Sequence, residues 1–169
     1  QAKRPVINAG NGIRLAGAHE TFMKVAEKLG IPVVTGWDSE DCIWNEHPLY
    51  TGRGGNMGDR AGNFAIQNSD LVLSIGSRLS IRHKTWARAA YVIVNDIDEE
   101  ELKKPSIHVD MPVHADAADL LAVMDQCLDQ VLEAEKDTLP DSLSEPRKKQ
   151  VFAYGEGIKG MTWNETCAM

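Results

Sequence analysis

The sequence predicts an α/β fold, a doubly wound and mostly parallel sheet with helices on both faces, of the Rossmann-like kind. Short segments that are apolar along their whole length alternate with segments of helical periodicity. A strand that is apolar on both faces needs a cover on both, which the helices between successive parallel strands supply. The chain has 169 residues, 43% of them hydrophobic, and this is enough to bury the core of one such domain.

The first half of the chain contains two predicted strands and a long loop. Residues 5–9 read PVINA and end at a glycine turn, and apolar residues then recur at helical spacing as far as residue 29. Residues 31–35 read IPVVT and predict a second buried strand. Residues 37–60 are rich in Gly, Asp and Asn, and we interpret them as a loop too long to serve only as a connection.

The second half repeats the alternation of helix and strand. A short helix is predicted at residues 61–68, followed by buried strands at 70–75 and 91–96. Residues 106–109 and 113–115 predict one or two shorter strands, which we expect at the edge of the sheet.

The last predicted helix begins at Ala118, and Cys127 within it is expected in the core. Its buried side is expected to carry Leu120, Leu121, Val123, Met124, Leu128, Val131 and Leu132. From residue 133 the apolar pattern gives way to Asp, Pro, Ser and Lys. We therefore place the domain at residues 1–134 and interpret residues 135–169 as a linker toward a missing C-terminal domain. Both ends of the chain are expected to continue into a longer protein.

Composition and motifs exclude several classes of function. The net charge of −7 disfavours nucleic acid as a partner, and no apolar run approaches the length of roughly 20 residues that a membrane span needs. Cys42, Cys127 and Cys167 are scattered without metal-binding spacing, which is typical of a reducing, cytoplasmic protein. The histidines also lack metal-binding spacing. Since no nucleophile elbow or catalytic carboxylate pair is present, no catalytic or metal-binding residue is expected in this chain.

Glycine and polar residues follow each predicted strand, where parallel sheets bind their ligands. These residues are Gly10, Asn11 and Gly12, then Gly36, then Gly76, Ser77 and Arg78, then Asp96, and finally Asp116. Together they outline one rim suited to a dinucleotide. The first turn lacks the third glycine of the NAD fingerprint, because Leu15 stands at that position.

Each of these residues also has a plainer interpretation. The first glycine pair is consistent with a plain tight turn. Asp96 and Asp116 are as consistent with capping a helix as with accepting hydrogen bonds from a ligand. Arg78 and Arg82 lie one helical turn apart, where a guanidinium could hold a pyrophosphate or form a surface salt bridge.

Several ordered motifs resemble the central domain of thiamine-diphosphate enzymes of the acetolactate synthase type. Residues 4–12 read RPVINAGNG, close to the RPVILAGNG opening of that domain, and residues 28–35 read KLGIPVVT, close to its LGIPVVTT. Residues 47–52 read HPLYTG, which is similar to HPLYLGMPG. Residues 70–78 (DLVLSIGSR) and 94–102 (VNDIDEEEL) resemble ADLLLVLGAR and HIDIDPAEL, and residues 113–117 (VHADA) resemble PIVGDA. The resemblance covers about residues 3–132.

The resemblance implies a three-domain enzyme that acts on 2-oxo acids as a homodimer or homotetramer. Its first and third domains activate thiamine diphosphate and bind it with Mg²⁺, so neither site lies in this chain. The central domain of such enzymes carries FAD in a non-redox role, or ADP, or nothing. By matching positions, the ligand would contact Gly10, Asn11, Gly12, Ile13, Thr35, Gly36, Gly76, Ser77, Arg78, Arg82, Asp96, Ile97, Asp116 and Ala117.

Two segments depart from the family pattern. Residues 76–82 read GSRLSIR where acetolactate synthases read GARFDDR, and residues 37–41 read WDSED where MGKG is usual. We therefore carry three hypotheses. The first is a non-catalytic domain of a 2-oxo acid decarboxylase or carboligase, inactive by itself. The alternatives are a stand-alone nucleotide-binding or sensor domain, and a structural spacer that has lost its ligand.

Overall fold

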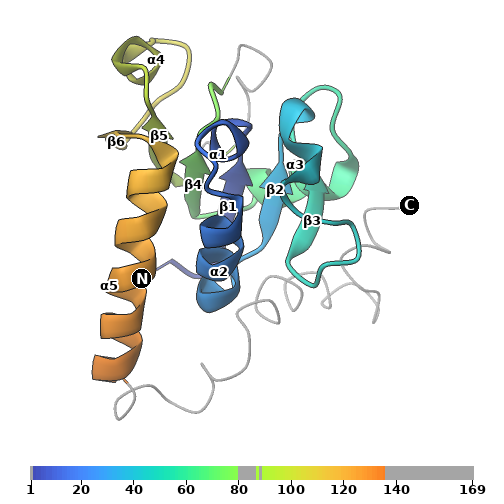
Figure 1. The fold of residues 1–169 in the computed structure, drawn as a ribbon. Helices are drawn as coiled ribbons and strands as arrows, with labels where there is room; N and C mark the ends of the chain where they lie inside the picture. Colours follow the sequence, from blue (N-terminus) through green and yellow to red (C-terminus); the bar gives the residue numbers. More distant parts are fainter. Residues whose placement is uncertain (1, 80–86, 88, 136–169) are drawn as a thin grey trace.

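The computed structural model describes residues 2–79, 87 and 89–135, which form one sheet with helices packed on it (Figure 1). The strands are β1 (Pro5–Ala9), β2 (Val33–Thr35), β3 (Tyr50–Arg53), β4 (Leu71–Ile75), β5 (Tyr91–Asp96) and β6 (Met111–His114). The helices are α1 (Gly12–Leu15), α2 (His19–Leu29), the 3-10 helix η1 (Trp37–Cys42), α3 (Arg60–Gln67), α4 (Glu99–Lys103) and α5 (Ala117–Glu135).

The strands are ordered β3-β2-β1-β4-β5-β6, and every neighbouring pair in this sheet is parallel. The chain moves outward from β1 to β3, returns to the other side of β1 at β4, and continues outward to β6. The order therefore reverses between β1 and β4, and parallel sheets of this order bind ligands at that switch point. The predicted doubly wound fold is confirmed.

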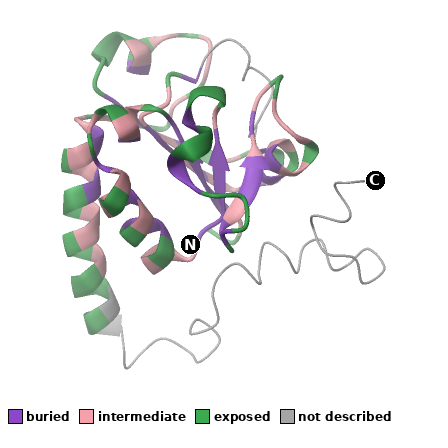
Figure 2. Ribbon diagram, turned by 45° about the vertical axis from the view of Figure 1, so that its right-hand side comes forward, coloured by how far each residue is buried: buried purple, intermediate pink, exposed green. Residues whose placement is uncertain are grey.

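Helices cover both faces of the sheet, as the apolar strands require. On one face α2 and α5 pack on β1 and β4 through a core that includes Phe22, Leu121 and Ile7, each fully buried. On the other face α3 packs through Ile66 and α4 through Leu102. The buried residues run along the strands and the inner sides of these helices (Figure 2). Full burial of one such side chain stabilises the fold by about 1.5–3 kcal/mol.

One prediction about the loops is wrong, and the open choice between one and two edge strands is decided in favour of one. Residues 37–60 contain the helix η1 and the edge strand β3, so they are not one continuous loop. β3 reads YTGR, with Gly52 at a φ of 119°, and it is a strand because it pairs with β2 and packs on α3. Residues 106–109 are not a strand, and the edge at this end is the single strand β6.

The buried side of α5 is narrower than predicted. Leu121 is fully buried, but Val123, Val131 and Cys127 are exposed. The reason is that α5 contacts the sheet on one side and α2 on a second, while in the described residues no element covers its third side. The side chain of Leu132 lies outside the described residues. No helix in the described ranges has both the length and the apolar character that a membrane crossing requires.

Candidate functional site

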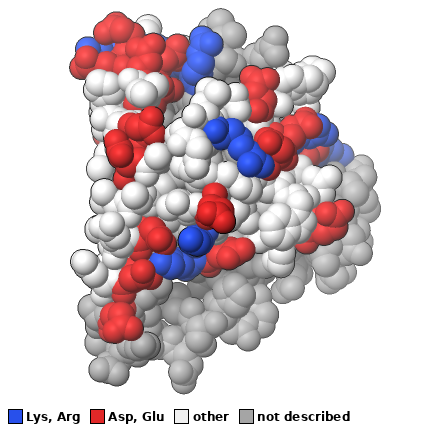
Figure 3. All heavy atoms as spheres, viewed as in Figure 1, with Lys and Arg blue, Asp and Glu red and all other residues white. Residues whose placement is uncertain are grey.

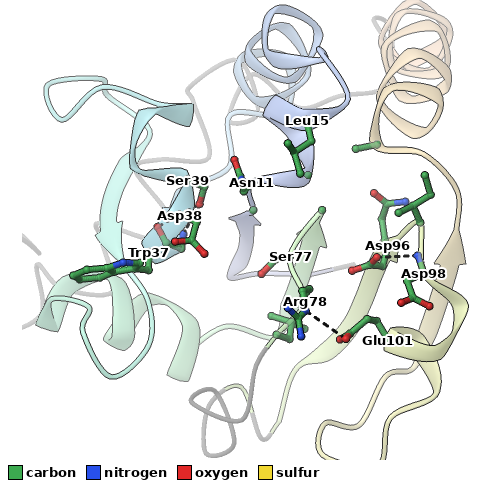
Figure 4. A pocket seen from close by; sticks show the side chains of 18 of the residues that line it. Asn11, Leu15, Trp37, Asp38, Ser39, Ser77, Arg78, Asp96, Asp98 and Glu101 are labelled. Carbon is green, nitrogen blue, oxygen red and sulfur yellow. Dashed lines mark hydrogen bonds and ion pairs between the residues drawn. The ribbon is translucent and has the colours of Figure 1, made fainter.

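A cavity of about 890 Å³ opens beyond the carboxyl ends of β1, β4 and β5, at the switch point of the sheet (Figure 4). Most of the residues expected at a site line it, namely Gly10, Asn11, Gly12, Gly36, Gly76, Ser77, Arg78, Asp96, Ile97, Asp116 and Ala117. Segments that are more than 100 residues apart in the sequence therefore meet around one space.

Two of the expected residues that the structure describes do not line the cavity. Ile13 is fully buried in the core between the first turn and α5, and Thr35 is fully buried at the end of β2. Thr35 still shapes the site, because its carbonyl oxygen accepts the N–H of Gly54 at 2.9 Å and so holds the loop after β3. Arg82 lies outside the described residues.

The glycines of the first turn allow the turn after β1 to pack closely against the turn after β4. The N–H of Gly10 donates to the carbonyl oxygen of Ile75, and the N–H of Gly12 donates to that of Gly76, both at 2.9 Å. A Cβ on Gly10 would lie 2.2 Å from the carbonyl oxygen of Gly76. Gly76 itself has a φ of 60°, which side-chain-bearing residues rarely adopt. These glycines are therefore required by the backbone, whatever the cavity binds.

One wall of the cavity comes from η1, whose residues had no recognisable signal in the sequence. Ser39 anchors this helix, because its Oγ accepts the N–H of Gly36 at 2.8 Å and donates to the carbonyl oxygen of Ala9 at 2.7 Å. Trp37 and Asp38 line the cavity beside it (Figure 4). Trp37 is 58% exposed. An aromatic residue is thus part of this wall.

Ion pairs fix the outer side of η1 to its neighbours. Asp41 pairs with Arg14 of α1, with 3.0 Å between Oδ2 and Nε. Glu40 pairs with Arg53 of β3 at 2.6 Å, and this carboxylate raises the pKa of the Arg53 guanidinium. These pairs are exposed, so they orient the wall more than they stabilise the fold.

The loop between β3 and α3 forms a second part of the wall. Asp59 caps α3 by accepting the N–H of Gly62 at 2.7 Å, and its other oxygen accepts the N–H of Arg53 at 2.9 Å. Asn63 accepts the N–H of Gly55 at 2.9 Å. With both ends of the loop held, Met57 is presented at the cavity with 59% of its surface exposed.

The far side of the cavity is polar and acidic. Asp96 accepts the N–H of Asp98 at 3.0 Å, and Asp116 accepts the N–H of Ala118 at 2.7 Å at the start of α5. The helix-capping interpretation of Asp116 is therefore correct, although the same residue also lines the cavity. Each of these hydrogen bonds uses one carboxylate oxygen.

Asn95 adds an acceptor that the sequence did not single out. Its amide nitrogen donates to the carbonyl oxygens of Val113 and Ala115, at 3.2 and 2.8 Å. Its Oδ1 is buried and has no hydrogen-bond partner among the described residues, although Asn95 lines the cavity. A buried acceptor without a partner costs free energy unless a ligand or water donates to it.

Arg78 is the one cation among the described residues that line the cavity. Its Nε lies 3.4 Å from Glu101 Oε1, and its side chain is 79% exposed. Hydrogen bonding from Lys104, together with the charge of Arg78, lowers the pKa of the Glu101 carboxyl. The carboxylates of the lining are those of Asp38, Asp96, Asp98, Glu101 and Asp116.

Comparison with known proteins identifies the family. The family model described as "Thiamine pyrophosphate enzyme, central domain" matches residues 1–124. The chain belongs to this family. The resemblance seen in the ordered motifs is thereby confirmed, and the doubly wound sheet is consistent with such a domain.

The relatives of this central domain include acetolactate synthase large subunits and a sulfoacetaldehyde acetyltransferase. It is 38% identical over 164 residues to a probable acetolactate synthase large subunit of Methanococcus aeolicus, with 95% of this chain and 26% of that protein covered. It is 34% identical over 170 residues to the corresponding protein of Methanocaldococcus jannaschii, with 90% and 29% covered. A sulfoacetaldehyde acetyltransferase of Alcaligenes xylosoxydans is 35% identical over 129 residues, with 70% and 21% covered. The chain thus spans less than a third of the length of these relatives.

Proposed function

We propose that this chain is the non-catalytic central domain of a longer enzyme of the acetolactate synthase type, which uses thiamine diphosphate and Mg²⁺ to decarboxylate a 2-oxo acid and join the fragment to an acceptor. The match to the central-domain family over residues 1–124 carries this proposal. The acetolactate synthase relatives at 38% and 34% identity support the reaction class. In this proposal the thiamine diphosphate and Mg²⁺ sites belong to the domains outside this chain, and the intact protein is a cytoplasmic homo-oligomer.

We further propose that the cavity takes FAD or ADP in a non-redox role. Its volume of about 890 Å³ is within the usual range of ligand sites, roughly 300–1,000 Å³. Asn95 offers a buried oxygen without a partner in the described residues, and Asp96 and Asp116 offer acceptors for ribose hydroxyls. Trp37 and Met57 offer a flat, polarizable wall for a ring. The nucleoside part of the ligand therefore fits the lining.

The diphosphate fits the cavity if Arg78 leaves its partner Glu101. Arg78 is the cation available in the described lining, and in the structure it is paired with Glu101. Because its side chain is mostly exposed, Arg78 can turn from Glu101 to a phosphate at small cost. In a non-redox role the bound cofactor supplies binding free energy to the domain and no electron transfer.

Calorimetric titration of the chain with FAD, ADP and NAD tests the ligand. FAD or ADP is expected to bind, and NAD is expected not to, because the first turn lacks the third glycine of the NAD fingerprint. If all three titrations are silent, the cavity is not a cofactor site of this domain. A structural spacer is then the function to adopt, and the excess of carboxylates in the lining favours it as the second candidate.

The reaction is tested on the longer protein. With thiamine diphosphate, Mg²⁺ and pyruvate, the intact enzyme is expected to form acetolactate, or an acetyl-transfer product when a suitable acceptor is present. The isolated chain is expected to give neither. Turnover by the isolated chain would overturn the assignment of a non-catalytic domain.

A further inference from the structure

The turn after β1 contains an Asn-Gly pair, Asn11-Gly12, which occurs nowhere else in the sequence. Asparagine before glycine is chemically labile, because the glycine has no side chain to hinder attack by its backbone nitrogen on the asparagine amide. Asn11 is exposed, lines the cavity and makes no side-chain capping hydrogen bond at the start of α1 (Figure 4). Water therefore reaches its side chain.

The reaction open to this pair is deamidation, in two steps. The backbone nitrogen of Gly12 loses its proton to a base in the solvent and bonds to Cγ of Asn11. The bond between Cγ and Nδ2 breaks, and the departing nitrogen takes a proton from the solvent and leaves as ammonia. Water then opens the succinimide ring at either carbonyl carbon. The products are aspartate and isoaspartate, and in isoaspartate the main chain runs through Cβ and Cγ and is one carbon longer.

The folded backbone holds Asn11 away from the geometry of ring closure. The ring forms only when the nitrogen of Gly12 eclipses Cβ of Asn11 about the bond between Cα and the carbonyl carbon. Asn11 has a ψ of −20°, and so small a ψ brings the nitrogen of Gly12 close to eclipsing the backbone nitrogen of Asn11 instead. The attacking atom thus lies away from the side chain.

Three hydrogen bonds keep the peptide group between Asn11 and Gly12 in this orientation. The carbonyl oxygen of Asn11 accepts the N–H groups of Arg14 and Leu15, both at 3.0 Å. The N–H of Gly12 donates to the carbonyl oxygen of Gly76 at 2.9 Å, so the turn after β4 holds the proton that the reaction must remove. Rotation of the peptide group toward ring closure breaks all three bonds.

We propose that Asn11 is a deamidation site that the contact between Gly12 and Gly76 keeps closed. The reaction is blocked while the two turns are in contact and proceeds when they separate. An isoaspartate then prevents the turns from closing again. Gly12 is packed so tightly that even a Cβ on it would lie 2.6 Å from the Cα of Gly76, which leaves no room for a longer main chain. The modification therefore makes the opening of this turn permanent.

Deamidation also changes the charge of the cavity, because both products carry a carboxylate. Arg78 is the one cation of the described lining, and acidic side chains gather over α4, whose Glu101 lines the cavity (Figure 3). A further carboxylate at position 11 opposes a bound phosphate. The modified domain is thus expected to lose nucleotide binding, a consequence that rests on the function proposed above.

Peptide mass mapping of the whole 169-residue chain tests the proposal. The chain is incubated at mildly alkaline pH, either folded or unfolded in guanidinium chloride, and the aspartate and isoaspartate peptides are separated by chromatography. Asn11 is expected to react about a hundredfold more slowly in the folded chain, because three hydrogen bonds oppose the reactive conformation. Equal rates in the folded and unfolded chains would overturn the proposal.

Two substitutions separate the contact between the turns from the stability of the whole domain. Gly76→Ala places a Cβ 2.7 Å from the Cα of Gly12, and it is expected to speed deamidation of the folded chain about tenfold. Gly30→Ala is the matched control, because Gly30 has a φ of 59° and Gly76 one of 60°, but Gly30 lies at the end of α2. It is expected to leave the rate unchanged. If both variants react equally fast, general destabilisation controls Asn11 and the proposal fails.

Asn11→Asp supplies the carboxylate without the longer main chain. This variant is expected to keep the melting temperature of the parent chain, whereas the chain that carries isoaspartate is expected to melt at a lower temperature. Circular dichroism measures both. An isoaspartate form that melts with the parent would show that the turn closes again after the modification, and the permanent opening would be wrong.

Discussion

Gly12 and Gly76 are in direct backbone contact at the switch point of the sheet. The N–H of Gly12 donates to the carbonyl oxygen of Gly76 at 2.9 Å, and a Cβ on Gly12 would lie 2.6 Å from the Cα of Gly76. The turn after β1 and the turn after β4 thus support each other before any ligand arrives. The glycine sequence of the first turn is explained by this contact, and cofactor binding has to be tested at other residues.

Gly10→Ala is expected to destabilise the domain by about 3 kcal/mol or more, because its Cβ would lie 2.2 Å from a backbone oxygen that cannot easily move. Gly17→Ala is the matched control. Gly17 has a φ of 66° and no heavy atom within 4 Å of an added Cβ, so the expected cost is the backbone strain of about 1–2 kcal/mol. Urea unfolding measures both variants. Equal costs would show that the contact between the two turns does not constrain the fold.

Trp37→Leu is expected to weaken FAD binding about threefold to tenfold, because a ring stacked on an aromatic side chain gains about 0.5–1.5 kcal/mol. Trp44→Leu is the control, since Trp44 is as exposed as Trp37 but packs edge-on against His47 and does not line the cavity. Calorimetry gives both dissociation constants. If the two variants bind FAD equally, the ligand ring does not lie on the η1 wall.

Arg78→Gln is expected to weaken ADP binding about tenfold and to leave adenosine binding unchanged, because the guanidinium contacts only a phosphate in the proposed pose. Glu101→Gln is expected to strengthen ADP binding, since it releases Arg78 from its partner at 3.4 Å. Titration with ADP and adenosine in parallel distinguishes the loss of the guanidinium charge from a change in the structure of the rim. Equal loss for ADP and adenosine would place the role of Arg78 in the structure of the rim.

Asp70 is expected to hold the N-terminal segment in a pH-dependent way. Burial opposes the charge of its carboxylate, but hydrogen bonds from the N–H groups of Lys3 and Arg4, at 2.7 and 2.8 Å, outweigh this and lower its pKa. A lowered pKa means that the stabilisation is complete above the unfolded value of about 3.9 and is lost as the pH falls through the folded value. Hydrogen exchange at Lys3 and Arg4 should therefore rise in acid.

Asp70→Asn provides the check on this pH dependence. The variant is expected to show faster exchange at both amides at neutral pH, with no further change in protection as the pH falls. The comparison is made after correction for the intrinsic effect of pH on exchange. Protection that is lost in acid to the same extent in the variant would show that another group carries the effect.

Part of the candidate site was predictable from the sequence for a simple geometric reason. The carboxyl ends of parallel strands meet at one edge of a sheet, so residues that follow strands, such as Gly76 and Asp96, had to come together once the strands were recognised. Trp37, Met57 and Asn95 were missed. The first two lie in segments interpreted as one long loop, and Asn95 falls inside a strand, where only the burial of its neighbours reveals an acceptor without a partner.

The sequence by itself determined the doubly wound parallel sheet and the family, because apolar strands, glycine turns and ordered motifs are local features that any fold of this chain must satisfy. The tertiary structure alone decided which side of α5 is buried, that residues 50–53 pair as the edge strand β3, and that Gly10 serves a contact between turns. These outcomes depend on which surfaces meet across long sequence separations. Helical and strand periodicity predicts that a face is apolar, but only packing decides which neighbour, if any, covers it.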